Sequence, residues 1–76
     1  MQRIEEGKST LFRNNGRELR MLWDSLTVGT PEGARVMVVD SSKPSGQRII
    51  FDKSGADHEL NDLKALAEEL IRAELG

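Results

Sequence analysis

Apolar and polar positions alternate over short stretches through most of the chain and follow a helical period near its end. The segment Lys8–Asn14 is short and β-prone in its middle, and Asn15-Gly16 follows it. This dipeptide is typical of a two-residue β-hairpin turn, because both residues tolerate positive φ. The pattern therefore predicts a strand that ends in a tight reversal.

The next segment, Arg17–Leu26, fits two structures. Leu19 and Met21 alternate with charged residues, as in a returning strand. A second apolar set has the spacing of one face of an amphipathic helix: Leu19, Leu22, Trp23 and Leu26. We expect a strand over 17–21 followed by a short helix over 23–27. A single helix over 17–26 stays open as the alternative.

A second hairpin is predicted after the turn formers of residues 28–33. Ala34–Val39 is rich in β-branched residues and predicts a strand. Asp40–Gly46 consists of turn-forming residues and predicts a loop. Gln47–Phe51 is the expected partner strand, and Lys53-Ser54-Gly55 is expected to end it.

The last segment, Ala56–Leu75, predicts an amphipathic helix. Ser54 or Asp57 is the expected N-cap, and the acidic residues of the first turn suit the helix dipole. Glu68 and Arg72 form an i, i+4 pair. One broad stripe carries the apolar residues: Leu60, Leu63, Leu66, Ala67, Leu70 and Ile71.

Composition limits how such a chain can be stabilised. Its 76 residues make one small domain, with no cysteine and one histidine, so neither a disulfide nor a zinc site supports the core. We therefore expect a homodimer. The sequence shows neither a leader peptide nor a membrane-spanning stretch, which favours a cytoplasmic protein without membrane contact.

Charge divides the chain into two parts. Residues 1–55 hold nine basic and seven acidic side chains, whereas residues 56–76 hold two basic and six acidic ones. A mildly basic body (1–55) and an acidic helix (56–76) are expected to meet different partners.

No set of residues indicates catalysis. Gly7-Lys8-Ser9-Thr10 resembles the end of a phosphate-binding loop, but it lacks the earlier glycine and the preceding strand. His58 has no nearby serine or cysteine in a triad-like context, and the acids around it, Asp57, Glu59 and Asp62, are expected to complement the helix dipole. We expect no enzyme activity, no cofactor and no metal site.

The segment Thr10–Met21, with its hydrophobic-Phe strand and Asn-Gly turn, resembles the opening of antitoxins of the VapB and MazE kind. The order of two hairpins around a short helix is similar to the AbrB/SpoVT layout. The resemblance covers about residues 9–53, although the proline that ends the second strand in that family is missing here. It implies an α+β fold in which two chains interleave their hairpins into a swapped-hairpin β-barrel homodimer, with the amphipathic helix at the C-terminal end.

The resemblance also implies a function. The protein would be a DNA-binding transcriptional repressor of a toxin–antitoxin system. Double-stranded DNA would meet polar residues of the first hairpin: Lys8, Arg13, Asn14, Asn15, Arg17 and Arg20. A toxin would meet the apolar stripe of the last helix: Leu60, Leu63, Leu66, Leu70 and Ile71. Packing of this stripe on its own dimer stays open, and a small protein-binding inhibitor or adaptor without DNA contact is the alternative function.

Overall fold

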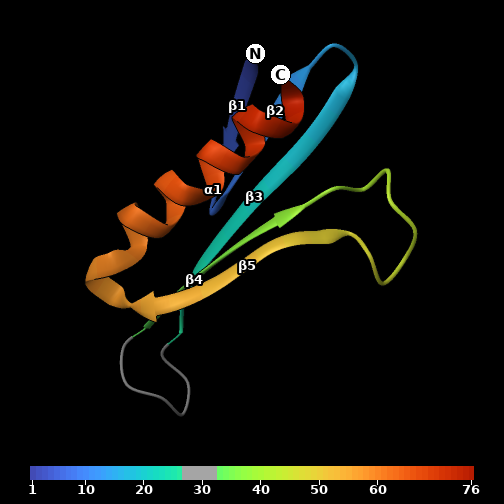
Figure 1. Ribbon diagram of the computed structural model, residues 1–76. Coiled ribbons are helices and arrows are strands. Elements are labelled where there is room, and N and C mark those ends of the chain that lie inside the picture. Colours follow the sequence, from blue (N-terminus) through green and yellow to red (C-terminus); the bar gives the residue numbers. More distant parts are fainter. Residues whose placement is uncertain (27–32) are drawn as a thin grey trace.

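The computed structural model describes residues 1–26 and 33–76 and consists of one antiparallel sheet with a helix across one face (Figure 1). Five strands follow each other in the sheet in chain order, so the α+β class is confirmed and the sheet is open within one chain. The strands are β1 (Gln2–Glu6), β2 (Ser9–Asn14), β3 (Arg17–Leu26), β4 (Gly33–Val39) and β5 (Ile49–Ala56). A short 3-10 turn, η1 (Asp57–Glu59), leads into the helix α1 (Leu60–Leu75).

The first predicted hairpin is confirmed. β2 pairs with β3, and the turn between them places Asn15 at φ 51° and Gly16 at φ 78°, the region that these two residues tolerate. The pattern did not predict β1, an exposed and mostly charged strand that pairs with β2.

The predicted short helix over 23–27 and the alternative single helix over 17–26 are both wrong, because β3 runs unbroken from Arg17 to Leu26. Leu19 and Met21 are buried on the face that α1 covers, whereas Leu22 lies on the opposite face. Apolar side chains on both faces of a strand produced the helix-like spacing. Pairing with β2 and β4 then satisfies the backbone as a strand. Residue 27, the end of the expected short helix, lies outside the described residues.

The second hairpin is confirmed, with corrected limits. β4 begins at Gly33, and the rest of the turn expected at residues 28–33 lies outside the described residues. β5 starts later than expected and continues through Lys53-Ser54-Gly55, which was expected to end it. These residues stay extended because they pair with Val36, Arg35 and Ala34 of β4.

The predicted final helix is confirmed, but its predicted start at Ala56 is wrong: pairing with Gly33 makes Ala56 the last residue of β5, and α1 begins at Leu60 after η1. The helix shares one hydrophobic core with the sheet. Neither expected side-chain cap forms: the Glu59 carboxylate instead accepts a hydrogen bond from the Ala56 backbone N–H at 3.0 Å. Glu68 and Arg72 pair as expected, at 3.5 Å. The core comes from both layers: Phe12, Leu19, Met21, Ala34, Val36, Val38, Leu63, Ala67, Ile71 and Leu75.

Candidate functional site

Two of the cations expected at DNA, Arg13 and Lys8, form ion pairs at the edges of the first hairpin. Arg13 lies opposite Glu18 in the β2–β3 register, and its Nη2 lies 2.6 Å from the Glu18 Oε1. Lys8 Nζ lies 3.3 Å from the Asp24 Oδ1. A phosphate would have to compete with these carboxylates, so the pairs lower the net positive charge that the hairpin offers to DNA.

Asn14 and Arg17 hold the C-terminal end of α1. Asn14 Nδ2 donates to the Leu75 carbonyl at 3.0 Å, and Arg17 Nη1 donates to the Glu74 carbonyl at 2.9 Å. The last carbonyls of a helix lack partners within it and carry partial negative charge, so a guanidinium and an amide stabilise them. Two of the residues expected at DNA, Asn14 and Arg17, therefore stabilise the end of α1 in this fold.

Arg17 also joins the hairpin to the end of β4. Its Nη2 lies 3.0 Å from the Asp40 Oδ2 and 3.1 Å from the Glu74 Oε2. Asp40 is buried, and its Oδ1 accepts hydrogen bonds from the Ser42 hydroxyl at 2.6 Å and the Ser42 backbone N–H at 3.0 Å. The Ser42 hydroxyl and then Arg17 lower the pKa of Asp40 to about 2. Hydrogen bonds to Asp40 and then Glu74 raise the pKa of Arg17.

The remaining two expected DNA residues lie apart. Asn15 is exposed at the tip of the β2–β3 turn. Arg20 is half-buried on the sheet face that α1 leaves open, and its Nη1 donates to the Ser9 Oγ at 3.3 Å. The six residues therefore do not form one basic surface.

The stripe expected to bind a toxin faces mainly into the protein. Leu63 and Ile71 are buried in the shared core, and Leu60 packs against it. Leu70 is half-buried, whereas Leu66 is 45% exposed. In this conformation Leu66 is the most accessible of the five leucine and isoleucine residues expected at a toxin.

The sheet face opposite α1 carries an apolar band that the sequence reasoning missed. In-register residues of antiparallel strands share a face, so Ile4, Leu11, Val39 and Ile49 form one row across the sheet, interrupted by Arg20. Leu22 and Met37 stand beside it in the next row. Ile4 is 38% and Ile49 56% exposed, and the other four are half-buried. We call these six residues the open-face patch.

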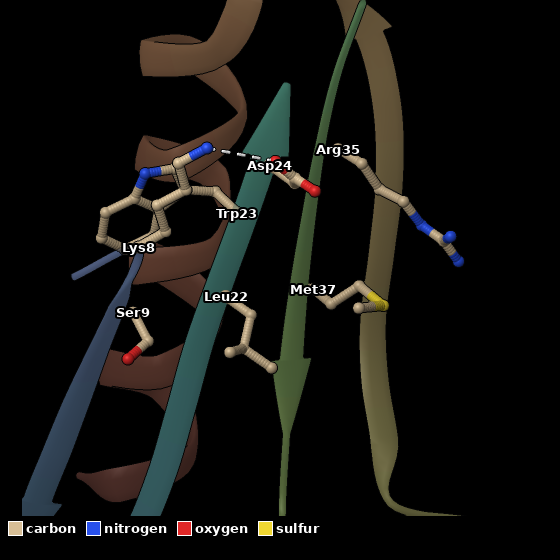
Figure 2. Close-up of a pocket in the computed structure, with 7 residues that line it drawn as sticks. All are labelled: Lys8, Ser9, Leu22, Trp23, Asp24, Arg35 and Met37. Carbon is tan, nitrogen blue, oxygen red and sulfur yellow. Dashed lines mark hydrogen bonds and ion pairs between the residues drawn. The ribbon is translucent and has the colours of Figure 1, made fainter. Parts of the chain in front are cut away.

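A shallow hollow of about 540 Å³ lies at one side of this patch. Figure 2 shows Leu22 and Met37 on neighbouring strands with the helix behind them, and the Lys8–Asp24 ion pair at the rim. Arg35 forms a bidentate ion pair with Asp52, with Nε donating to Oδ1 at 2.9 Å and Nη2 to Oδ2 at 2.6 Å. This pair raises the pKa of Arg35 and lowers the pKa of Asp52. The hollow therefore has an apolar floor and a rim of paired charges.

A sequence signal for the patch existed. Val36-Met37-Val38-Val39 is an uninterrupted apolar run, and such runs are typical of strands whose two faces are both apolar. Val36 and Val38 are buried under α1, so Met37 and Val39 must lie on the other face.

The loop between β4 and β5 carries two cations that form no ion pair with a carboxylate among residues 1–26 and 33–76. Residues 41–48 are all exposed and contain Lys43 and Arg48 but no acid. Arg48 Nε donates to the Lys43 carbonyl at 2.9 Å, which holds both cations on one loop. Figure 1 shows this loop extending away from α1.

No family model, curated protein or solved structure matches this chain. Among residues 1–26 and 33–76, no cluster of histidine, cysteine and acidic side chains could hold a metal ion. No helix in the same residues is long and apolar enough to cross a bilayer. The open-face patch is therefore the feature from which a function is best argued.

Proposed function

We propose that the protein is a small, non-catalytic protein-binding module whose open-face patch receives a partner protein. The observation that carries this proposal is the patch itself: five aliphatic side chains and Met37 on a sheet face that no element of residues 1–26 and 33–76 covers. Contiguous exposed apolar surface rimmed by polar residues is typical of protein-interaction sites. Antiparallel sheets without a partner on their second face usually present polar side chains there.

The charges around the patch favour a protein partner over nucleic acid. Arg13, Lys8 and Arg35 each pair with a carboxylate, so the rim has no strong positive field. Arg20, inside the row, donates to the Ser9 hydroxyl and leaves one positive charge on this face. None of the six patch residues is aromatic, and Trp23, which lines the adjoining hollow, already has the Lys64 Nζ 3.9 Å from its ring centroid, where a base would otherwise stack. An aliphatic side chain of the partner would fit the hollow over Leu22 and Met37.

A selection from a random-peptide display library on the immobilised protein tests this proposal. Enriched peptides should carry apolar anchors and lose about tenfold or more in affinity for Met37→Lys and Leu22→Lys, because each lysine places a charge on the apolar floor. Leu66→Lys, an exposed leucine on α1, is the matched control and should leave binding unchanged. Peptides that bind both patch variants as tightly as the original protein would contradict the proposal.

A second candidate is the DNA-binding regulator of the antitoxin type that the resemblance implies, with two chains exchanging hairpins and a toxin on the helix. One observation favours DNA contact: the acid-free loop 41–48 with Lys43 and Arg48. A two-stranded β-ribbon fits the major groove of B-form DNA. The loop cations would thus take over the contacts expected of Arg13 and Arg17.

Mobility shifts on double-stranded DNA at several salt concentrations test this candidate. Replacing Lys43 and Arg48 together by alanine should weaken binding and reduce the salt slope by about 2 for each chain, or about 4 for the dimer, at about one unit for each lost phosphate contact. Lys64→Ala, on α1, is the control. The absence of any shift at about 50 mM salt and micromolar protein would rule this function out, since nonspecific affinities already fall near that range.

A further inference from the structure

The first strand, β1, is an open sheet edge whose sequence is complementary to itself. Among residues 1–26 and 33–76 it pairs with β2 alone, and all five of its own residues are exposed. We propose that two copies of the protein join by antiparallel pairing of their β1 strands, centred on Ile4, into one continuous sheet. This proposal concerns an edge, whereas the proposed function concerns a face.

The hydrogen-bonding pattern shows which backbone groups of β1 are free. The Lys8 carbonyl accepts from the Trp23 N–H at 3.2 Å, so it points toward β3. The direction of the backbone N–H and C=O groups alternates from one residue to the next along a strand. These groups therefore point toward β1 at Ser9, Leu11 and Arg13. Their register partners in β1 are Glu6, Ile4 and Gln2. The N–H and C=O groups of the intervening residues, Arg3 and Glu5, therefore point out of the sheet edge.

This alternation restricts how a second β1 can pair. The free backbone N–H and C=O groups of one β1 must face those of the other β1. The two-fold axis that relates the two copies therefore has to pass through a residue and not between two residues. An axis at Ile4 places Arg3 of each copy opposite Glu5 of the other, with hydrogen bonds between their backbones. An axis at Arg3 would place two arginines opposite each other, and an axis at Glu5 two glutamates. Like charges directly opposite are unfavourable, so only the Ile4 register is complementary.

The Ile4 register also buries apolar surface. The two Ile4 residues would form a pair without backbone hydrogen bonds, the closest kind of cross-strand contact. Ile4 is 38% exposed in the single chain and lies in the apolar row of the open face. Antiparallel pairing keeps both open faces on the same side of the joined sheet. The two patches would therefore become one surface across the dimer axis.

The other edge is a poorer candidate for the same contact. β5 has a register irregularity opposite Val38 and Val39, and its end leads directly into η1 and α1. Bulges and covered ends are devices that protect sheet edges from pairing. β1 has continuous pairing over its whole length and no such protection.

Charge reversal and rescue, measured by sedimentation equilibrium, test the proposal. The unmodified protein should be a dimer at micromolar concentration. Arg3→Glu and Glu5→Arg should each weaken the dimer about tenfold or more, because each creates like-charge pairs on both sides of the axis. The double variant, with both changes, should recover most of the affinity. A monomer at about 100 μM, or a double variant as weak as the single ones, would overturn the proposal.

Two controls distinguish pairing at this edge from contacts elsewhere on the protein. Within its own chain Arg3 also contacts Glu5 at 3.3 Å, Glu68 at 3.0 Å and the Phe12 ring at 5.3 Å. The double variant keeps opposite charges at positions 3 and 5 of one chain as well as across the axis, and Glu68→Ala should leave the dimer intact. Met37→Lys alters the open face and should also leave it intact. If Met37→Lys instead dissociates the dimer and Arg3→Glu does not, the open face is the dimer interface and the edge proposal is wrong. Peptide binding by Met37→Lys tests the proposed function separately.

Discussion

Asp40→Asn is expected to destabilise the protein by about 2–3 kcal/mol, the most that we expect from changing one polar side chain. Asp40 is buried and accepts from Ser42 twice, and it pairs with Arg17 at 3.0 Å. An amide cannot accept equally from all these donors and leaves Arg17 with Glu74 alone. The hairpin, the end of β4 and the end of α1 therefore lose their common link.

Urea unfolding followed by Trp23 fluorescence measures this loss. Asp52→Asn is the matched control, since Asp52 pairs with Arg35 at the surface, and exposed pairs contribute less than about 1 kcal/mol. Equal losses for the two variants would show that the Asp40 link adds nothing beyond an ordinary surface pair.

The same link predicts how stability changes with acid. The pKa of Asp40 is lowered to about 2, below the value of about 3.9 that an aspartate has in an unfolded chain. Between these values the unfolded state binds the proton and the folded state does not, so stability falls as the pH falls. The contribution is complete above about pH 5 and is lost near pH 2. The stability difference between the protein and Asp40→Asn should shrink over this interval.

The local signals in the sequence predicted β2, β4, β5, the first half of β3, the Asn15-Gly16 turn and the helix. Each depends on neighbouring residues: β-branched runs, a turn dipeptide or a helical stripe. β3 was harder, because the position of Leu22 on the open face gives the same spacing as a helix, and only pairing with β2 and β4 decides the outcome. β1 was missed because an exposed edge strand needs no apolar alternation.

The candidate site could be predicted less well than the fold. Arg17 and Asn14 are polar residues near a hairpin turn, and nothing in their spacing shows that Asp40 and the end of α1 are their partners. These partners come from distant parts of the chain, so only the folded arrangement reveals them. Glu18, by contrast, lies opposite Arg13 in the hairpin that the Asn15-Gly16 turn predicts.

The largest effect is expected from removing α1. Deleting residues 60–76 takes away Leu63, Ala67, Ile71 and Leu75, and it exposes the sheet residues that they cover. A small domain has a total stability of about 5–15 kcal/mol, and this deletion removes one of the two layers of its core. The truncated chain should be unfolded by circular dichroism. A separable partner-binding tail, as the sequence suggests, would instead leave a folded and dimeric remainder.

Single substitutions on α1 give a graded test of the same point. Ile71 is fully buried, so Ile71→Ala should cost about 2–5 kcal/mol through lost contacts and a cavity. Leu66 lies on the same helix but is 45% exposed, so Leu66→Ala should change the free energy of unfolding by no more than about 0.5 kcal/mol. Urea unfolding of both variants measures the difference. Equally small losses would mean that the helix is only weakly attached in solution. The apolar stripe of α1 would then be free for a partner, as the antitoxin resemblance implies. A large loss of unfolding free energy for Ile71→Ala alone would instead show that the stripe packs on the sheet.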